Sequence, residues 1–251
     1  MASGSGGIDA LGQFALTTHL GPIGASVNFT QSNLMMLVAA VLTVALMWIG
    51  MRPRAMVPGR LQAAAEMGYE TVMSMCVDTI GDEGKKFFPI VFTLFFFILF
   101  GNLLGVFPYF FTFTSHIAVT MALSLFVFML VTVVALREHG MHFFSYFVPP
   151  GVPGLLIPLM VLIEVISYLS RIISLSVRLF ANMMAGHVML KVFGSFIVML
   201  GGLGVIGYPA AGLSLAVNTM LIGFELLVAC LQAYVFAVLT CIYLHDAVHL
   251  H

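Results

Sequence analysis

Charged side chains are scarce in this sequence. Asp, Glu, Lys and Arg make up 8% of its 251 residues, and 61% of the residues are hydrophobic. An ordinary soluble domain contains about 25% charged residues, so a soluble fold is excluded and the composition is that of a polytopic membrane protein. The net charge of −1 supplies no basic surface, so nucleic acid is not a predicted partner.

Cysteine, basic residues near the N-terminus and nucleotide-binding motifs are also lacking. Three scattered cysteines indicate neither a disulfide framework nor a zinc site. Residues 1–31 contain no Lys or Arg, which argues against a cleaved signal peptide. No G-x-x-x-x-G-K-[ST] loop is present. The chain is therefore not expected to be an enzyme of nucleotide chemistry, and no cofactor is predicted.

The C-terminal tail has a loose resemblance to a metal-ligand spacing. A solvated terminus is the simpler interpretation, because zinc sites have tighter spacings, and no metal site is predicted. The tail residues concerned are His245, Asp246, His249 and His251.

Five apolar stretches are long enough to cross a bilayer, whose hydrocarbon core of about 30 Å needs about 20 helical residues. The predicted fold is one all-α membrane domain over residues 1–251, with residues 1–31 as an external segment. The five stretches are 32–51, 87–107, 115–136, 155–199 and 208–244.

Residues 60–80 differ from these spans. Apolar residues such as Leu61, Ala64 and Val72 recur at helical spacing, while Gln62 and Glu66 mark another face. This pattern predicts an amphipathic helix on the membrane surface.

The last two stretches are longer than one upright crossing requires. Residues 155–199 would extend about 55 Å or more as a helix, at 1.5 Å per residue. We therefore expect 155–244 to form a long, steeply tilted hairpin, with its centre near Val205 in a glycine-rich turn.

Basic residues predict the orientation. With five crossings, six of the nine Lys and Arg residues fall on one side, and the positive-inside rule makes that side cytoplasmic. The N-terminus is then outside and the C-terminus in the cytoplasm. The six residues are Arg52, Arg54, Arg60, Lys85, Lys86 and Arg137.

Polar residues form a stripe with a seven-residue spacing on each of the last two helices. Seven residues turn a helix by about 700°, so residues spaced by seven share one face. Two facing polar stripes offer a route for water and protons, because buried polar groups need partners. The stripes are Glu164, Arg171 and Arg178, and Asn218, Glu225 and Gln232.

Arg178 is the most informative member. An arginine cannot lose its charge in a protein, and placing it in hydrocarbon costs roughly 3 kcal/mol on insertion scales. A permanent cation at this depth indicates a function, although a structural pair with Glu225 or Asn182 is the alternative. Arg171 is a weaker indicator of function, because its side chain could reach the cytoplasmic membrane interface or pair with Glu164.

His187 extends the constellation. It lies nine residues after Arg178, on about the opposite face of the helix. In an antiparallel hairpin centred near Val205, His187 is level with Glu225, and Arg178 is level with Gln232. An imidazole and a carboxylate at one level can pass protons, whereas Asn182 and Gln232 could equally be packing groups that hydrogen-bond between helices.

These residues resemble subunit a of the F-type ATP synthase. The resemblance rests on the run from Arg178 to His187 (Arg-Leu-Phe-Ala-Asn-Met-Met-Ala-Gly-His), the Glu225/Gln232 spacing, and Gly101-Asn-Leu-Leu-Gly-Val-Phe-Pro108 followed by Thr114-Ser-His. It covers nearly the whole chain after residue 30, and the His187/Glu225 order is similar to the mitochondrial arrangement, which indicates an alphaproteobacterial relative.

The resemblance implies a function and partners. Arg178 would face a rotating ring of c subunits, each with a membrane-embedded carboxylate. Protons would enter from outside past His187 and Glu225 and leave near Glu164. Further partners would be b-type peripheral stalk subunits and the other ATP synthase subunits, with ATP chemistry on those subunits, in a bacterial inner membrane rather than a mitochondrial one.

Two other function classes compete with this interpretation. An ion-coupled secondary transporter also uses intramembrane Arg and Glu, but such transporters usually contain internal repeats, and the two halves of this chain are dissimilar. A membrane anchor or assembly subunit would need no aligned Glu, Arg and His.

Overall fold

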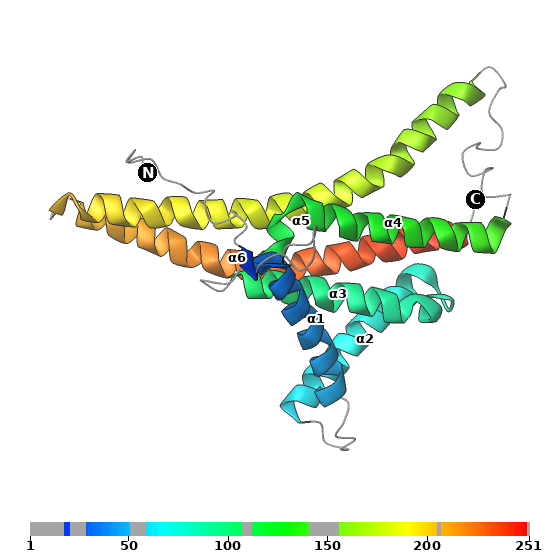
Figure 1. Ribbon diagram of the computed structural model, residues 1–251, viewed down its shortest axis with the longest axis horizontal. Coiled ribbons are helices and arrows are strands. Elements are labelled where there is room, and N and C mark those ends of the chain that lie inside the picture. The colour runs from blue at the N-terminus through cyan, green and yellow to red at the C-terminus, as the bar shows by residue number, and fades with distance from the viewer. Residues whose placement is uncertain are drawn as a thin grey trace.

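The computed structural model describes residues 18–20, 29–50, 59–106, 112–140, 156–204 and 207–249, and these are helical apart from short connections and one small β-pair (Figure 1). This confirms the all-α membrane fold. A 3-10 turn, η2 (Phe113–Ser115), precedes the fourth helix, and strands β1 (Thr18–Leu20) and β2 (Phe29–Thr30) pair antiparallel. The helices are α1 (Gln31–Gly50), α2 (Arg60–Ile80), α3 (Gly84–Val106), α4 (Ile117–His139), α5 (Ile157–Gly201) and α6 (Tyr208–Val248).

Five of these helices, all except α2, are long and apolar enough to span a membrane, as the sequence predicts. Their ends extend beyond several predicted boundaries. α3 begins at Gly84 rather than at residue 87, and α4 continues to His139 rather than to 136. The added turns carry Lys85, Lys86 and Arg137, whose long side chains can reach water from a helix end.

A tight turn joins α2 to α3. Gly81 ends α2 with φ of 87°, a left-handed conformation that favours glycine, and its N–H donates to the carbonyl of Val77. Lys85 then pairs with Asp82 at 2.9 Å. The Lys85 ammonium, through this hydrogen bond and its charge, holds the pKa of the Asp82 carboxyl below its ordinary value.

The core lies where α2, α3 and α4 pack around the C-terminal half of α6. Ala229, Ala233 and Ala237 of α6 are fully buried. Their four-residue spacing places three small side chains on one face, which lets α3 approach α6 closely. Phe236 and Leu244 fill the same core and are also fully buried.

α5 and α6 form the predicted hairpin. In Figure 1 the second half of α5 lies beside the first half of α6 and extends beyond the other helices, while the first half of α5 diverges. α1 runs across this hairpin rather than along it. The tilt of the hairpin relative to the bilayer remains a prediction.

α2 packs against α1, α3 and α6, and its buried face differs from the predicted one at its first turn. Gln62 is buried and donates a hydrogen bond to Glu66 at 2.8 Å, whereas Leu61 is 64% exposed. The buried Ala65 and Val72 follow the predicted apolar face. The intrahelical bond gives the Nε2 of Gln62 a partner, which reduces the cost of placing this polar residue on the inner side.

Several expectations fall outside the described residues. These concern residues 1–17 and 21–28 of the N-terminal segment, Arg52 and Arg54, the hairpin centre at Val205, and His251.

Candidate functional site

The carboxylate of Glu225 on α6 lies beside the imidazole of His187 on α5. The Nδ1 of His187 is 3.6 Å from the Oε1 of Glu225, and the two side chains are 14% and 5% exposed. This confirms that the two residues are level in the hairpin. An acid and a base at this separation can exchange a proton after a small movement or through one water molecule.

Gly186 allows this approach. A Cβ atom built on Gly186 would lie 2.9 Å from the Oε1 of Glu225, closer than side-chain atoms normally pack. The carboxylate of Glu225 therefore occupies space that any other residue at position 186 would fill. Glycine at position 186 leaves the carboxylate where it lies, and a larger residue there would displace it; the backbone of Gly186 remains helical.

Thr112 is the third group at the site. Its hydroxyl lies 2.7 Å from the Nε2 of His187. The backbone before η2 is held in turn, since the hydroxyl of Ser115 donates to the carbonyl of Thr112 at 2.6 Å. Gly105 of α3 leaves the space that the Thr112 side chain occupies. His187 is thus hydrogen-bonded to Thr112 through Nε2, while its Nδ1 faces the carboxylate of Glu225 at 3.6 Å.

A buried amide joins α3, η2 and α6 near this level. Asn102 of α3 accepts a hydrogen bond from Thr114 at 3.0 Å and donates to the carbonyl of Ala229 at 3.4 Å. Ala229 is one helical turn after Glu225. Asn102 and Thr114, which belong to the two motifs of the resemblance, thus help to position η2 against α6.

The polar stripe of α6 is directed into the protein, as its spacing predicts. Glu225 and Gln232 are buried, and Asn218 carries a buried Oδ1. Within the described residues, both carboxylate oxygens of Glu225, the Nε2 of Gln232 and the Oδ1 of Asn218 form no hydrogen bond. Glu225 has the imidazole of His187 at 3.6 Å, whereas burying polar groups without any hydrogen bond is costly. Such a cost is typical of positions that serve a function rather than packing.

Arg178 lies on the other face of α5 and is exposed. Its guanidinium donates a long hydrogen bond, 3.4 Å, to the hydroxyl of Ser174, which is also exposed. In the part of the chain that the structure describes, Arg178 forms no ion pair, and Glu225 pairs with His187 instead. A charged side chain is therefore presented on the outer surface of an apolar hairpin. The predicted proximity of Arg178 and Gln232 remains a prediction.

Arg171 has a different environment. Its guanidinium forms an ion pair of 3.2 Å with Asp246, and its Cζ lies 5.0 Å from the ring centre of Tyr243 and 5.6 Å from that of Tyr168. The hydroxyl of Tyr168 is 2.8 Å from that of Thr132 on α4. Arg171 therefore links α5 to the end of α6. The sequence interpretation, which considered the interface or Glu164, did not identify Asp246 because it treated the tail as solvated.

The remaining predicted residues are less defined. Glu164 lies in the first half of α5 and is partly buried, and Asn182 is partly buried between Arg178 and His187 along the helix. Their roles in a pathway remain predictions. Thr112 and Gly186 were missed because neither residue type is distinctive, and the contact of Thr112 with His187 joins the segment before η2 to α5.

Comparisons with known proteins identify the family of this chain. The family model described as ATP synthase A chain matches residues 33–245. The chain is 64% identical to ATP synthase subunit a of Granulibacter bethesdensis over 97% of its length and 98% of that protein. It is 61% identical to ATP synthase subunit a of Acidiphilium cryptum, with 98% of each chain covered. The identity to the protein of the same name in Gluconacetobacter diazotrophicus is 58%, over 99% of each chain. This chain, with its five membrane-spanning helices, therefore belongs to the ATP synthase subunit a family of bacterial multi-pass membrane proteins.

Proposed function

We propose that this chain is the proton-conducting stator subunit that exchanges protons with a rotating ring of c subunits. Two half-channels, open to opposite sides of the membrane, end at the surface that carries Arg178. Each proton binds to a ring carboxylate from one half-channel and leaves through the other after rotation. Arg178 prevents direct passage between the two.

The exposed and unneutralised charge of Arg178 is the observation that carries this proposal. Its guanidinium has no acidic partner in the described residues, although Glu225 lies on the adjacent helix. A cation in an apolar surface needs a carboxylate, and a partner ring would supply one. Because a guanidinium keeps its protons, it attracts a carboxylate without relaying a proton.

The outer half-channel is proposed to end at His187 and Glu225. The two groups are within 3.6 Å, and the hydroxyl of Thr112 can accept or donate at the second ring nitrogen of His187. Such a pair holds and transfers a proton inside the protein. Asn218 lies two helical turns before Glu225 on the same stripe, toward the hairpin turn, where it can line the approach.

The cytoplasmic half-channel is proposed to pass Glu164. Asn182 and Gln232 would line the region between the two channels, close to Arg178. Arg171 is proposed to hold the walls together, because its ion pair with Asp246 joins α5 to the end of α6. The N-terminus would lie outside the cell and the C-terminus in the cytoplasm.

Coupling explains why a fixed cation is needed. One elementary charge crossing 100 mV releases about 2.3 kcal/mol, so several protons must drive rotation for each ATP made. A proton that passed directly from Glu225 to Glu164 would dissipate this energy. ATP chemistry would lie on other subunits, which together with the c-ring and a b-type stalk are the proposed partners.

Cross-linking tests the proposed ring-facing surface. Ser174 is exposed on the Arg178 side, whereas Ser176 of the same helix is fully buried and 3.2 Å from the hydroxyl of Thr120. In a Cys230→Ala background, Ser174→Cys should form a disulfide with a cysteine placed beside the ring carboxylate. Ser176→Cys is the matched control and should not. Equal yields from both variants would contradict the proposal.

Substitution of the cation tests the mechanism. We expect Arg178→Ala to assemble normally and to abolish both ATP synthesis and ATP-driven proton pumping in vesicles. Lys191→Gln removes a cation from the same helix away from the proposed ring contact and should retain activity. Normal pumping by the Arg178→Ala complex would disprove the assigned role.

A further inference from the structure

Two pairs of side-chain hydroxyls join α4 to α5. The hydroxyl of Thr120 lies 3.2 Å from that of Ser176, and the hydroxyl of Thr132 lies 2.8 Å from that of Tyr168. Thr120, Ser176 and Tyr168 are buried, and Thr132 is partly buried. Thr132 follows Thr120 in the chain whereas Tyr168 precedes Ser176, as antiparallel neighbours require. We call these contacts the α4–α5 hydroxyl pairs.

Both threonines of α4 also bond to their own helix. Thr120 donates to the carbonyl of Ile117 at 3.1 Å, and Thr132 donates to that of Phe128 at 2.8 Å. A hydroxyl has one hydrogen and can accept with its lone pairs. All four contacts therefore form together only when the hydroxyls of α5 donate to α4. The threonines are two acceptors at fixed positions on α4.

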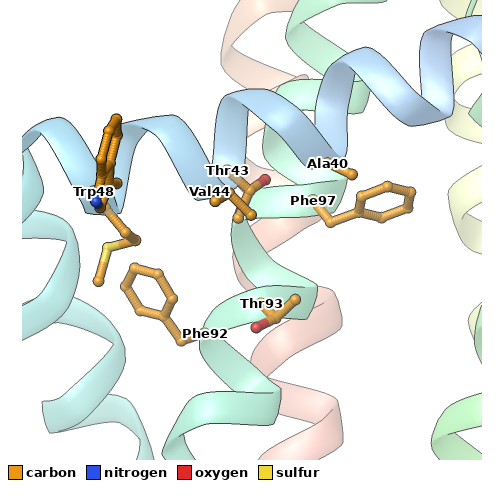
Figure 2. A pocket seen from close by; sticks show the side chains of 8 residues that line it. Ala40, Thr43, Val44, Trp48, Phe92, Thr93 and Phe97 are labelled. Carbon is orange, nitrogen blue, oxygen red and sulfur yellow. The ribbon is translucent and has the colours of Figure 1, made fainter.

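Hydroxyls on another pair of neighbouring helices make no such bond. Figure 2 shows Thr43 of α1 and Thr93 of α3 among the mainly apolar side chains between these helices. Thr43 donates to the carbonyl of Ala39 at 2.9 Å and Thr93 to that of Pro89 at 2.7 Å, and neither bonds to the facing helix within the described residues. A threonine can thus satisfy its hydrogen on its own helix. The bonds between α4 and α5 are not a general consequence of placing hydroxyls between helices.

The rotation of α5 about its own axis decides where its functional side chains point. His187 follows Ser176 by eleven residues, about 20° beyond three full turns, so the two residues share one face. Arg178 follows Ser176 by two residues, about 200° around the helix, and lies on nearly the opposite face. Ser176 is fully buried, the side chain of His187 is 14% exposed, and Arg178 is exposed. One rotation therefore directs His187 inward and Arg178 outward.

Apolar contacts give this rotation little preference. Leu175, Leu179 and Met183 are buried on the inner side of α5, but acyl chains are as apolar as these residues, so turning them toward lipid costs only their packing. A hydroxyl is different because it loses a partner that lipid cannot replace. A buried tyrosine hydroxyl in particular needs a partner, and a turn of α5 would take that of Tyr168 away from Thr132.

We propose that the α4–α5 hydroxyl pairs set the rotation of α5, and that Thr120 is a positioning residue for both Arg178 and His187. Thr120 touches neither side chain and acts through Ser176. The inference rests on the proposed function of Arg178 and His187, because a change in rotation acts on proton transfer through these two residues.

Thr120 provides the restraint nearest to the cation. The contact of His187 with the segment before η2 and the ion pair of Arg171 also restrain α5. They lie nine residues after Arg178 and seven residues before it. Ser176 precedes Arg178 by a rise of about 3 Å only. Loss of the Thr120 hydroxyl should therefore affect the direction of Arg178 more than loss of a hydroxyl elsewhere on α4.

Cross-linking in the assembled complex reports the rotation. Ser174 and Val177 are both exposed, about 40° and 100° around the helix from Arg178. In a Cys230→Ala background, Ser174→Cys should form more disulfide than Val177→Cys with a cysteine placed beside the ring carboxylate. Thr120→Val should bring the two yields closer by about three-fold, the population change from one interhelical hydrogen bond of average strength in a membrane.

The double variant Thr120→Val/Thr132→Val removes both acceptors and should bring the yields closer by about ten-fold. A yield ratio that is unchanged in the single and the double variant would overturn the proposal. Absence of disulfide from both cysteines with α4 unmodified would contradict the proposed function, and this inference with it. Disulfides whose ratio is independent of Thr120 would overturn the positioning role alone.

Two matched variants separate the hydrogen bond from packing. Thr120→Ser keeps the hydroxyl and should keep the yield ratio. Ser124 is also buried on α4, one turn after Thr120, but its hydroxyl donates to the carbonyl of Met121 at 3.1 Å and forms no bond to α5 within the described residues. Ser124→Ala should leave the ratio unchanged. An equal change in Ser124→Ala and Thr120→Val would show that packing sets the rotation and would overturn the proposal.

The number of protons pumped for each ATP hydrolysed is a second readout, in vesicles that contain the assembled complex. A turned Arg178 separates the half-channels poorly, so Thr120→Val should lower this number about three-fold, and Thr120→Ser should keep it. A variant that only reduces the amount of complex lowers pumping and hydrolysis together. An unchanged number in Thr120→Val would therefore overturn the positioning role.

Discussion

The hydroxyl of Thr112 and the Nε2 of His187 lie 2.7 Å apart, although 75 residues separate them in the sequence. Thr112 precedes a single 3-10 turn, and His187 lies within a helix of 45 residues. The contact fixes the ring of His187 from the side opposite Glu225. The orientation of the imidazole is therefore set by a short connecting segment as well as by the hairpin.

Replacing Thr112 by valine tests this relationship. Valine has nearly the same shape and lacks the hydroxyl, so the variant removes one hydrogen bond worth about 1 kcal/mol. We expect a roughly five-fold slower proton flux through vesicles that contain the membrane sector. Thr112→Ser keeps the hydroxyl and should retain most of the flux. Equal rates in the valine variant and the unmodified protein would show that Thr112 does not orient His187.

Gly186 provides a second test of the same site. A methyl group at this position would lie 2.9 Å from the Oε1 of Glu225, whereas Gly194 of the same helix has open space around the corresponding position. Alanine favours a helix over glycine by about 1 kcal/mol, so neither substitution should prevent folding. Gly186→Ala should displace the carboxylate of Glu225 and slow proton flux about ten-fold or more.

The control for this prediction is Gly194→Ala. It gives the same gain in helix propensity without a contact near Glu225, so proton flux should be unchanged. Comparable losses in both variants would indicate an effect on the helix itself rather than on the carboxylate.

The features that could be predicted are those written locally in the sequence. Hydropathy identifies the five spans because a helix in lipid forms all its backbone hydrogen bonds within one continuous apolar segment. The pairing of His187 with Glu225 could be predicted because the two residues are at nearly equal distances in sequence from the centre of the hairpin near Val205. Thr112 and Asp246 could not be identified in this way, because their contacts depend on how η2 and the last turn of α6 pack against α5.

Arg171 and Asp246 should stabilise the fold by a modest amount. Their side chains are 21% and 32% exposed, so solvent screens part of the attraction. A double-mutant cycle with Arg171→Gln and Asp246→Asn should give a coupling of about 0.5–1 kcal/mol in the free energy of unfolding in detergent. The coupling should decrease as salt is added. A coupling near zero at low salt would mean that the pair does not join the two helices.

Arg171→Lys separates charge from shape at the same position. Lysine keeps the charge but loses the planar group that lies near Tyr168 and Tyr243. We expect this variant to be less stable than the unmodified chain and more stable than Arg171→Gln. Full stability of Arg171→Lys would show that the aromatic contacts contribute nothing.

The packing of α2 onto α6 can be tested with the native cysteines. Cys76 of α2 and Cys241 of α6 are fully buried with their sulfur atoms 3.8 Å apart, whereas Cys230 is exposed. In the folded chain in detergent, N-ethylmaleimide should label Cys230 alone, and all three cysteines should react after unfolding in dodecyl sulfate. Mass spectrometry of the labelled peptides distinguishes the sites.

Cys230→Ala is the control and should abolish labelling of the folded chain. The argument depends on access, because a maleimide reaches a thiol in the core only when the surrounding helices separate. Labelling of Cys76 without Cys241 would mean that α2 leaves the core by itself. Labelling of both cysteines at the rate of Cys230 would show that α2 and α6 do not form a common core. Packing of α2 against α6 could then not be what holds α3 and η2 near Glu225.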